Sequence, residues 1–436
     1  GKDESAALVR DTLAQSAQIL IFENSRKNAE AAASRLSALL VPDEATRELS
    51  SRILASGESE TAVRLASCVS HGVAFHHAGL LPEQRRLVEQ GFRESRIKVI
   101  ASTPTLAAGL NLPGRRVLIR SYKRYEYGRG MAPIPVIEYR QMAGRAGRPG
   151  LDPYGESFLL AKNDAEMKEL FEHYINGSPE EIWSKLASQS ALRTHILSTI
   201  AAGFARSDSE LKAFMATTFY AQQQDSWQLD VTVEKVVQFL EENSMISDAE
   251  EELLPSKLGS LVSKLYIDPL SAVIMLEALE RKRADKNMVQ ASMKSSKFTP
   301  ALDLSRAASK APTELGLIHL ITMTPNMDLL YVQSADGWVE EFIDQHQSEL
   351  YDEDNYDYLL REAKTAAMLM DWIGEVNENQ IASRYRNGPG DIRRITDTAQ
   401  WLMHSLAELT TQLDLGLTFK AEHLAARIHS GATPDL

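Results

Sequence analysis

Short apolar runs alternate with helical patterns along the first third of the chain. Residues 18–22 (QILIF) are an apolar run, followed by Asn24, Ser25 and an alanine-rich stretch that reaches about Leu40. This order predicts a strand, a capped turn and a helix. Three further apolar runs of strand length lie at residues 98–103, 117–120 and 156–160. Strands that alternate with helices predict a mostly parallel sheet covered on both faces, with ligands at the carboxyl ends of its strands.

After Pro153 the apolar positions follow a helical period, most clearly in residues 357–374. One stripe of this helix predicts a buried face and consists of Leu359, Ala363, Ala366, Met370 and Ile373. A second stripe consists of Arg361, Thr365, Met368 and Trp372. A cation and a large aromatic ring on a non-core face can stack on single-stranded bases. The alternative is that Trp372 packs beneath the next domain.

The composition limits the classes of protein that fit this pattern. With 436 residues, of which 44% are hydrophobic and 25% charged, the chain is too long for one core, and we expect three or four domains. Its single cysteine, Cys68, excludes an intrachain disulfide framework. No apolar run approaches the roughly 20 residues that span a bilayer, and the N-terminus lacks a signal-peptide pattern. We therefore expect a cytoplasmic protein without a membrane partner.

Charge is unevenly distributed along the chain, whose formal net charge is −13. Residues 1–150 hold 22 lysines and arginines against 15 aspartates and glutamates, a charge of +7, so the other residues carry −20. This balance argues against a basic protein that coats nucleic acid. Any nucleic-acid contact in the acidic remainder must come from local groups, because the general field there repels phosphates.

The segment QMAGRAGRPG, residues 141–150, carries the most specific chemistry. It places Arg145 and Arg148 three residues apart among glycines that let the backbone approach a ligand. A guanidinium group stays charged and binds phosphate oxygens through two parallel hydrogen bonds. The segment therefore predicts an arginine-finger element for the γ-phosphate of a nucleotide. The alternative is a solvated loop of arginine and glycine.

Polar residues follow a predicted strand, or precede a predicted helix start, at three further places. These are Asn24-Ser25-Arg26, His76-His77-Ala78-Gly79, and Thr103-Pro104-Thr105 with Gly109. Each can present hydroxyl or backbone N–H groups to phosphate oxygens at the start of a helix. The paired histidines predict a turn rather than a metal site, because no Cys, Asp or Glu stands at ligand spacing.

Four ordered segments together resemble one protein family. Residues 19–30, 73–80, 99–119 and 141–150 are similar to motifs IV to VI of the second RecA-like domain of superfamily 2 helicases. The closest resemblance is to the Ski-like branch, and within it to the archaeal HelQ-type DNA repair helicases. Four motifs in order are more specific than any one of them. Outside these motifs the resemblance is weaker but covers most of the chain.

The resemblance implies roles for particular residues. Gln141, Arg145 and Arg148 would face the nucleotide across a cleft between two RecA-like domains, with Arg145 and Arg148 acting as finger and sensor. Gly109, Asn111 and Gly144 would lie near the nucleotide. The residues expected to track the DNA backbone are Ser25, Arg26, His77, Gly79, Thr103 and Thr105. Backbone contacts carry no sequence information, so the protein should recognise DNA by its structure.

The sequence contains no GxxxxGK[ST] phosphate loop. Asp43-Glu44-Ala45-Thr46 imitates a magnesium-binding DEAD motif, but it follows Pro42 in a polar stretch, so it predicts a helix start. The resemblance then implies that the first RecA-like domain is absent. ATP and Mg²⁺ would be bound mainly by that domain in the complete enzyme. The chain alone should hold no cofactor and should not hydrolyse ATP.

Residues 120–139 interleave tyrosines with cations, including Lys123, Arg124, Tyr125 and Arg129, and then contain glycines and prolines. This pattern predicts a protruding β-hairpin that can stack on bases and hold phosphates. In HelQ-type helicases a hairpin at this place is the pin that splits the duplex. The alternative is a mobile basic loop.

The expected fold is an α/β RecA-like domain followed by winged-helix and all-α domains. The expected boundaries are 1–175 for the RecA-like domain, 176–262 for the winged helix, 263–375 for a helical ratchet domain and 376–436 for a small helix-hairpin-helix-like domain. The winged helix should have a structural role. In the last domain, Gly388-Pro389-Gly390 can offer amides to a phosphate beside Arg393 and Arg394, or can be a plain helix-helix turn.

The function expected from this resemblance is the motor half of an ATP-dependent 3′ to 5′ DNA helicase that acts at replication forks. Expected partners are single-stranded and forked DNA, the absent first RecA-like domain, and replication or single-strand-binding proteins. We expect a monomer associated with the nucleoid. Two alternatives stay open: a clamp that binds nucleic acid without ATP, and an RNA helicase of the exosome-associated Ski branch.

Overall fold

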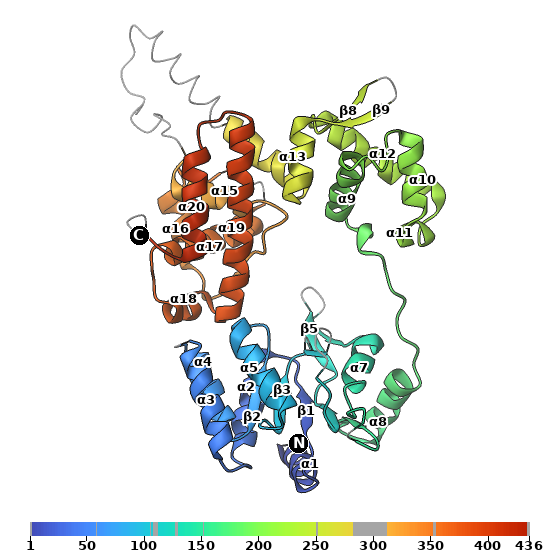
Figure 1. Cartoon of the computed structure of the whole chain (residues 1–436), viewed down its shortest axis with the longest axis vertical. Helices are drawn as coiled ribbons and strands as arrows, with labels where there is room; N and C mark the ends of the chain where they lie inside the picture. Colours follow the sequence, from blue (N-terminus) through green and yellow to red (C-terminus); the bar gives the residue numbers. More distant parts are fainter. Residues whose placement is uncertain are drawn as a thin grey trace. The chain divides into compact units, whose positions relative to one another are not determined.

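The computed structural model describes residues 2–57, 59–104, 106–107, 112–126, 130–150, 152–249, 252–281, 312–351 and 355–433. The chain forms two compact units. The first comprises Gly1–Glu181 with Arg386–Arg393, and the second comprises Ile182–Tyr385 with Arg394–Leu436. Figure 1 labels the helices and strands of both units.

A five-stranded parallel sheet forms the centre of the first unit, in the order β2-β3-β1-β4-β7. Its strands are β1 (Ile19–Phe22), β2 (Val73–His76), β3 (Val99–Ser102), β4 (Arg116–Ile119) and β7 (Glu156–Leu159). The four predicted strands are therefore confirmed. The edge strand β2 was not predicted, because only three apolar residues precede its paired histidines.

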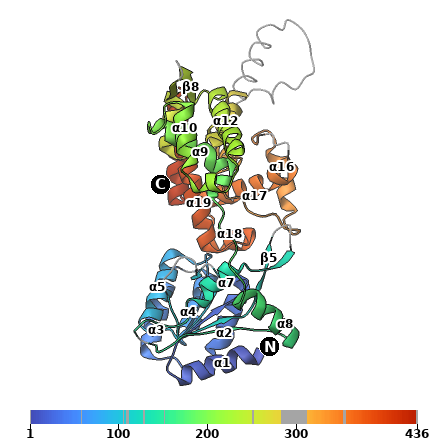
Figure 2. The same cartoon turned by 90° about the vertical axis from the view of Figure 1, so that its right-hand side faces the viewer.

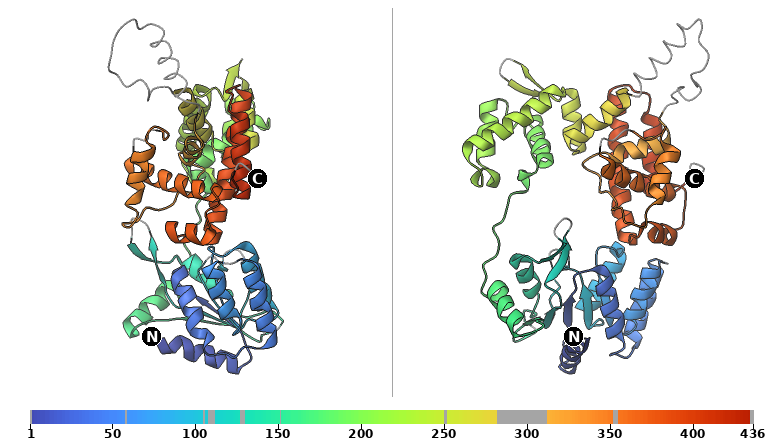
Figure 3. Two further views of the ribbon diagram at one scale, coloured as in Figure 1. Left: turned by 90° about the vertical axis from the view of Figure 1, so that its left-hand side faces the viewer. Right: turned by 180° about the vertical axis from the view of Figure 1, so that it is seen from behind.

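Helices of the first unit connect these strands. They are α1 (Lys2–Ala14), α2 (Arg26–Ser37), α3 (Glu44–Ala55), α4 (Glu60–Val69), α5 (Pro82–Arg93), α7 (Val136–Ala143), α8 (Asp164–Leu170) and the π-helix Phe171–Ile175. Connections between parallel strands are right-handed, so a strand order that reverses direction places helices on both faces of the sheet. Figure 3 shows helices on both sides of the strands.

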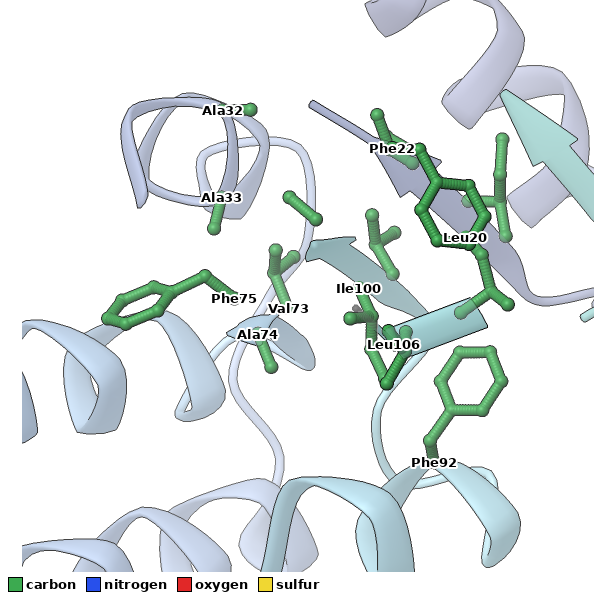
Figure 4. Packing of buried hydrophobic residues seen from close by; sticks show 14 of the residues in the cluster. Leu20, Phe22, Ala32, Ala33, Val73, Ala74, Phe75, Phe92, Ile100 and Leu106 are labelled. Atoms are coloured by element: carbon green, nitrogen blue, oxygen red, sulfur yellow. The ribbon is translucent and has the colours of Figure 1, made fainter. Parts of the chain in front are cut away.

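The core of the first unit lies between the sheet and these helices. Leu20, Phe22, Phe75, Phe92 and Ile100 are each at most 1% exposed. Figure 4 shows these side chains in one hydrophobic cluster that also contains Ala32 and Ala33 of α2. Burial of one such large apolar side chain contributes about 1.5–3 kcal/mol. The apolar runs of the sequence therefore form the interior, and the polar residues that follow them are left at the ends of the strands.

Two helix starts of this unit follow the sequence expectations. Ser25 caps α2 by accepting a hydrogen bond from the Asn28 N–H. Asp43 and Thr46 form a reciprocal capping box at the start of α3. The acidic segment is therefore a capped helix start, as predicted.

The second unit begins with a winged helix. Its elements are the short 3₁₀ helix Lys185–Ala187, α9 (Gln189–Ala201), α10 (Asp208–Ala216), α11 (Phe219–Gln222), α12 (Ser226–Glu242), β8 (Ile246–Ala249), β9 (Glu252–Pro255) and α13 (Lys257–Leu265). Strands β8 and β9 pair antiparallel and form the wing. A Cβ atom on Gly259 would lie 1.9 Å from the Met245 carbonyl oxygen, so α13 packs here only with glycine.

Helices also make up the rest of the second unit. They are Pro269–Arg281, α15 (Glu314–Thr322), α16 (Trp338–His346), α17 (Tyr356–Ile373), α18 (Glu378–Tyr385), α19 (Pro389–Gln412) and α20 (Thr418–Ser430). The first residues of α19, up to Arg393, belong to the first unit. Within the described residues no single helix has the length and apolarity to cross a membrane. Only Lys257–Leu265 with Pro269–Arg281, bent by 118°, would pass as a pair.

Helix α17 lies at the centre of this helical region. It contacts α15, α16, α18 and α20, and residues 362–369 are all buried. The interpretation of its second stripe as a non-core face is therefore wrong. Thr365, Met368 and Trp372 are buried, and the Trp372 indole donates to the Ile428 carbonyl of α20 at 2.8 Å. The period of one helix indicates which residues share a face, but the number of neighbours decides how many faces are covered.

Candidate nucleotide-binding and nucleic-acid-binding sites

The arginine loop, residues 144–155, lies at the amino edge of the sheet. It follows α7, which returns the chain from the end of β4 to the start of the parallel strand β7. The loop meets the residues just before β4: the Gly114 N–H donates to the Arg145 carbonyl at 3.0 Å, and the Gly147 N–H donates to the Gly114 carbonyl at 2.7 Å. Two segments far apart in the sequence are thus joined. The expectation that ligand-binding motifs lie at the carboxyl ends is wrong for this loop.

Close backbone packing holds the arginine loop together. Gly155, at the far end of the loop, lies against Ala146 and Gly147. A Cβ atom on Gly155 would stand 2.3 Å from the Ala146 carbonyl, so a larger residue here would force the loop open. Gly147 and Gly155 therefore let the main chains at the two ends of the loop lie in direct contact.

Arg148 is held in one place by three side-chain hydrogen bonds. Its Nε and Nη2 donate to the two carboxylate oxygens of Asp152, each at 2.8 Å, and Nη1 donates to Gln18 Oε1 at 2.9 Å. The hydrogen bond from Arg148 lowers the pKa of the Asp152 carboxyl. A guanidinium has five N–H donors, so this arrangement fixes the group and leaves donors for a further anion. The Arg148 side chain is 20% exposed.

Arg145 points toward the preceding motif. Its Nη2 donates to the Ala107 carbonyl at 2.6 Å, and its buried Nε has no hydrogen-bond partner among the described residues. Gln141 and Gly144 are exposed near the end of α7. The predicted nucleotide residues Gly109 and Asn111 lie outside the described residues. The structure therefore brings Arg145 and Arg148 together in one loop, with donors that are fixed before any ligand arrives.

Three of the predicted DNA-backbone residues lie at the opposite, carboxyl edge of the sheet. Ser25, His77 and Thr103 follow the neighbouring strands β1, β2 and β3. The Gly79 N–H donates to His77 Nδ1 at 3.2 Å, which assigns the ring hydrogen to Nε2, 3.1 Å from Glu30 Oε1. His77 thus shapes the turn through both ring nitrogens. Thr105 lies outside the described residues.

Arg26 is bound to a distant segment of the first unit. Its guanidinium donates to both carboxylate oxygens of Asp391. The Gly390 N–H donates to the Gly79 carbonyl at 3.1 Å, and the Gly388 N–H donates to the Asp391 carboxylate at 3.2 Å. The expectation that this turn offers open amides to a phosphate is therefore wrong, because both amides have partners in the chain.

Arg393 and Arg394 follow this turn, and their contact with DNA stays a prediction. Arg393 is the last residue of the first unit. Arg394, in the second unit, pairs with Asp328 of the same unit. Both partners of that pair are more than half exposed, so a phosphate can compete with Asp328 at little energetic cost.

The predicted β-hairpin is confirmed. Strands β5 (Lys123–Glu126) and β6 (Gly130–Pro133) pair antiparallel and project beyond the sheet (Figure 2). Lys123 is exposed and its Nζ lies 5.2 Å from the Tyr122 ring centre, whereas Arg124 pairs with Glu138. Arg129 and the Tyr125 side chain lie outside the described residues.

On α17, Arg361 keeps contact with exposed groups. Its guanidinium carbon lies 5.1 Å from the ring centre of Tyr331 and 5.5 Å from that of Tyr358. Thr365 and Trp372, its predicted companions in DNA binding, are 0% and 8% exposed, so neither side chain offers an open face to a base.

Sequence reasoning missed four residues of these sites: Gln18, Asp152, Tyr331 and Tyr358. Two of them left a sequence signal. Asp152 stands four residues after Arg148, and Tyr358 stands three residues before Arg361 on one helix face. Gln18 and Tyr331 reach their sites only through the fold.

Comparison with known families decides the identity of the first unit. Residues 4–150 match the family model described as "Helicase conserved C-terminal domain". This region is a helicase C-terminal domain. Residues 155–247 match a helix-turn-helix domain, and residues 315–431 match "Archaeal helicase, domain 4". The expected fold class is thereby confirmed, whereas the four domain boundaries stay predictions.

Curated relatives match the chain along its length. A protein named "ATP-dependent DNA helicase Hel308" from Methanocella arvoryzae is 45% identical over 100% of the chain and 58% of its own length. Proteins of the same name from Pyrococcus abyssi and Pyrococcus horikoshii are 37% and 36% identical over 93% and 98% of the chain. The chain spans 54–58% of the length of these relatives.

Proposed function

We propose that the chain is the C-terminal part of an ATP-dependent DNA helicase of the Hel308 kind. The observation that carries this proposal is the arginine loop, in which Arg148 and Arg145 are fixed by Asp152, Gln18 and a main-chain carbonyl. Charged donors fixed in advance suit a phosphoryl transition state, since they need no reorganisation as charge develops. The relatives are named as ATP-dependent DNA helicases, which supports this proposal.

In this proposal the two edges of the sheet have different ligands. The amino edge completes a nucleotide site whose phosphate loop and Mg²⁺ site belong to a first RecA-like domain. The carboxyl edge, with Ser25, His77 and Thr103, follows the backbone of one DNA strand. The chain alone should bind DNA without hydrolysing ATP, since its sequence has no GxxxxGK[ST] loop.

The remaining elements convert nucleotide-driven closure into unwinding. The β5–β6 hairpin separates the duplex, α17 contributes Arg361 to the single strand, and the winged helix supports the motor. Movement is 3′ to 5′, and the substrate is a replication fork under repair. We propose that the protein is a cytoplasmic, nucleoid-associated monomer whose partners include replication or single-strand-binding proteins.

A direct test uses the pure chain. It should bind labelled single-stranded DNA, measured by fluorescence anisotropy, with affinity that falls as salt rises because phosphate contacts release counterions. It should show no steady ATP turnover, and binding to RNA of the same sequence should be weaker. Steady turnover that Arg148→Ala abolishes would contradict the assignment of the phosphate loop to another domain. Equal or tighter binding to RNA would favour the RNA-helicase alternative.

A further inference from the structure

Three groups near the start of α17 form a cationic aromatic cluster, defined by Tyr331, Tyr358 and Arg361. Tyr331 is 63% exposed and Tyr358 is 50% exposed. Both rings face the Arg361 guanidinium at stacking distance, 5.1 and 5.5 Å from its central carbon. A large ring that stays exposed gains little for the fold. The cluster therefore presents two aromatic rings at the surface of the second unit, backed by the partly buried guanidinium of Arg361.

The loop that carries Tyr331 is held by buried polar groups of α17. The Thr365 hydroxyl accepts a hydrogen bond from the Leu330 N–H at 2.9 Å. The Lys364 ammonium donates to the Tyr331 carbonyl at 2.8 Å and to Asp336 at 2.8 Å. Thr365 is 0% and Lys364 1% exposed. A buried lysine is costly unless its donors are satisfied, so these bonds fix the loop firmly.

The consequence is that Tyr331 has a fixed backbone and an exposed ring. Hydrogen bonds hold the residue before it and its own carbonyl, while the side chain extends from the surface. Such an arrangement lowers the conformational entropy that a ligand must remove when it stacks on the ring. Thr365, predicted from the sequence to contact DNA, instead positions the loop.

Charges around the cluster favour bases over phosphates as its ligand. Asp328, in the same loop, is paired with Arg394, and Asp336 is paired with Lys364. Asp357, on the first turn of α17, is exposed. Asp357 and Arg361 stand four residues apart on one helix face, so their opposite charges offset each other. The flat faces of the two tyrosine rings and of the guanidinium, which stack on π systems, then determine which ligand the cluster binds.

We propose that Tyr331 is a base-stacking residue for single-stranded nucleic acid, with Arg361 and Tyr358 completing the platform. This inference rests on the proposed function, since it needs a single strand that reaches the second unit. Stacking on an aromatic ring tolerates every base, so the platform grips the strand without reading its sequence.

The test measures binding of labelled oligothymidine to the full chain by anisotropy at several salt concentrations. Tyr331→Ala should weaken binding about fivefold to tenfold, because the stacking contribution of one base is lost. Tyr331→Phe keeps the ring and should bind within about twofold of the original chain. The slope of log affinity against log salt should stay unchanged, since no phosphate contact is removed.

Tyr356→Ala is the matched control. Tyr356 lies on α17, as Arg361 does, and is 54% exposed. The Arg361 guanidinium stacks on Tyr331 and Tyr358 instead. The control should bind as the original chain does. Equal weakening by Tyr356→Ala, or unchanged binding by Tyr331→Ala, would overturn the stacking role. If the original chain binds no single strand at all, the proposed function fails together with the platform.

A double-mutant cycle tests the positioning role of Thr365. Thr365→Val removes the acceptor of the Leu330 N–H and should weaken binding severalfold when Tyr331 is present. In the Tyr331→Ala background it should have no further effect, because the loop then has no ring to position. Independent, additive losses would contradict a role that acts through Tyr331. Thermal unfolding followed by circular dichroism confirms that each variant is folded.

Discussion

Two arginines of this chain are held in opposite ways. Arg148, in the arginine loop, is bound through hydrogen bonds to a carboxylate and an amide. Arg361, on α17, lies against two tyrosine rings. Hydrogen bonds fix the direction of each N–H, whereas ring faces allow a guanidinium to slide and rotate. The first arrangement suits a charge that must stand at one point of a reaction. The second suits a contact that must form and break repeatedly on a moving strand.

The largest effect expected from this difference is on ATP turnover. In an intact helicase that also contains a phosphate-loop domain, Arg148→Ala should lower kcat by about 1000-fold or more, the scale of an arginine finger. Arg140→Ala is the control, because Arg140 donates to the Gly177 carbonyl away from the loop and should change kcat less than about twofold. Steady-state ATP hydrolysis measures both. A loss below about tenfold for Arg148→Ala would remove it from the nucleotide site.

The carboxylate that fixes Arg148 should matter next. Asp152→Asn replaces one acceptor oxygen with an NH₂ group that faces the guanidinium. The two parallel hydrogen bonds between Arg148 and residue 152 can then no longer both form. We expect kcat to fall about tenfold with KM for ATP changed less than threefold, because geometry rather than ground-state binding is lost. Asp152→Glu should recover part of the rate. A change in KM alone would indicate that Asp152 serves nucleotide affinity instead.

At Arg361 the effect should be smaller and should depend on ring contact. Arg361→Ala should weaken single-strand binding about fivefold, measured by anisotropy with oligothymidine. Arg361→Lys keeps the charge but loses the flat group that stacks between the tyrosines, so it should recover less than half of the lost binding energy. Complete recovery by lysine would show that charge alone acts here, and the contrast with Arg148 would disappear.

The smallest effect should appear in the pH dependence of stability. Arg148 lowers the pKa of Asp152 in the folded state. The pair therefore stabilises the fold at pH values above the unfolded pKa of about 3.9, and this contribution is lost as pH falls through the lowered pKa. Urea unfolding at pH 7 should show Asp152→Asn less stable by about 1 kcal/mol, the net scale of one lost hydrogen bond. The difference should vanish near pH 2, and a difference that persists there would assign the loss to packing.

Strands β1 and β3 were predictable because they are buried on both faces. They contain the uninterrupted apolar stretches 19–22 and 99–101, and each stretch is followed by polar residues at the carboxyl edge. Strand β2 was missed because its fourth residue is His76, whose burial depends on the distant Glu89 of α5. The local sequence predicts a strand when the strand's own residues form the apolar pattern. It does not predict a strand whose burial depends on a contact with a distant residue.

The sites show the same limit. Arg145 and Arg148 could be identified from the spacing of residue types in one loop. Their place at the amino edge could not, since it depends on where α7 returns the chain. The stripe of Arg361 and Thr365 was correctly assigned to one helix, but its burial depends on four neighbouring helices. The contact of Tyr331 with Arg361 could not be predicted, because Tyr331 lies in a loop 30 residues earlier in the chain.

Helix α5 connects the two edges of the sheet, and this gives the first unit a mechanical property. Its start follows the turn of His77 and Gly79, and near its end the Phe92 carbonyl accepts from Gln18, the residue that also holds Arg148. Twelve residues at 1.5 Å each make a rod of roughly 18 Å. A helix resists compression along its axis, so α5 and the hydrogen bonds of Gln18 form a stiff connection between the His77 turn and the guanidinium of Arg148. In the proposed function, α5 would therefore connect the DNA-binding edge of the sheet with the nucleotide-binding edge.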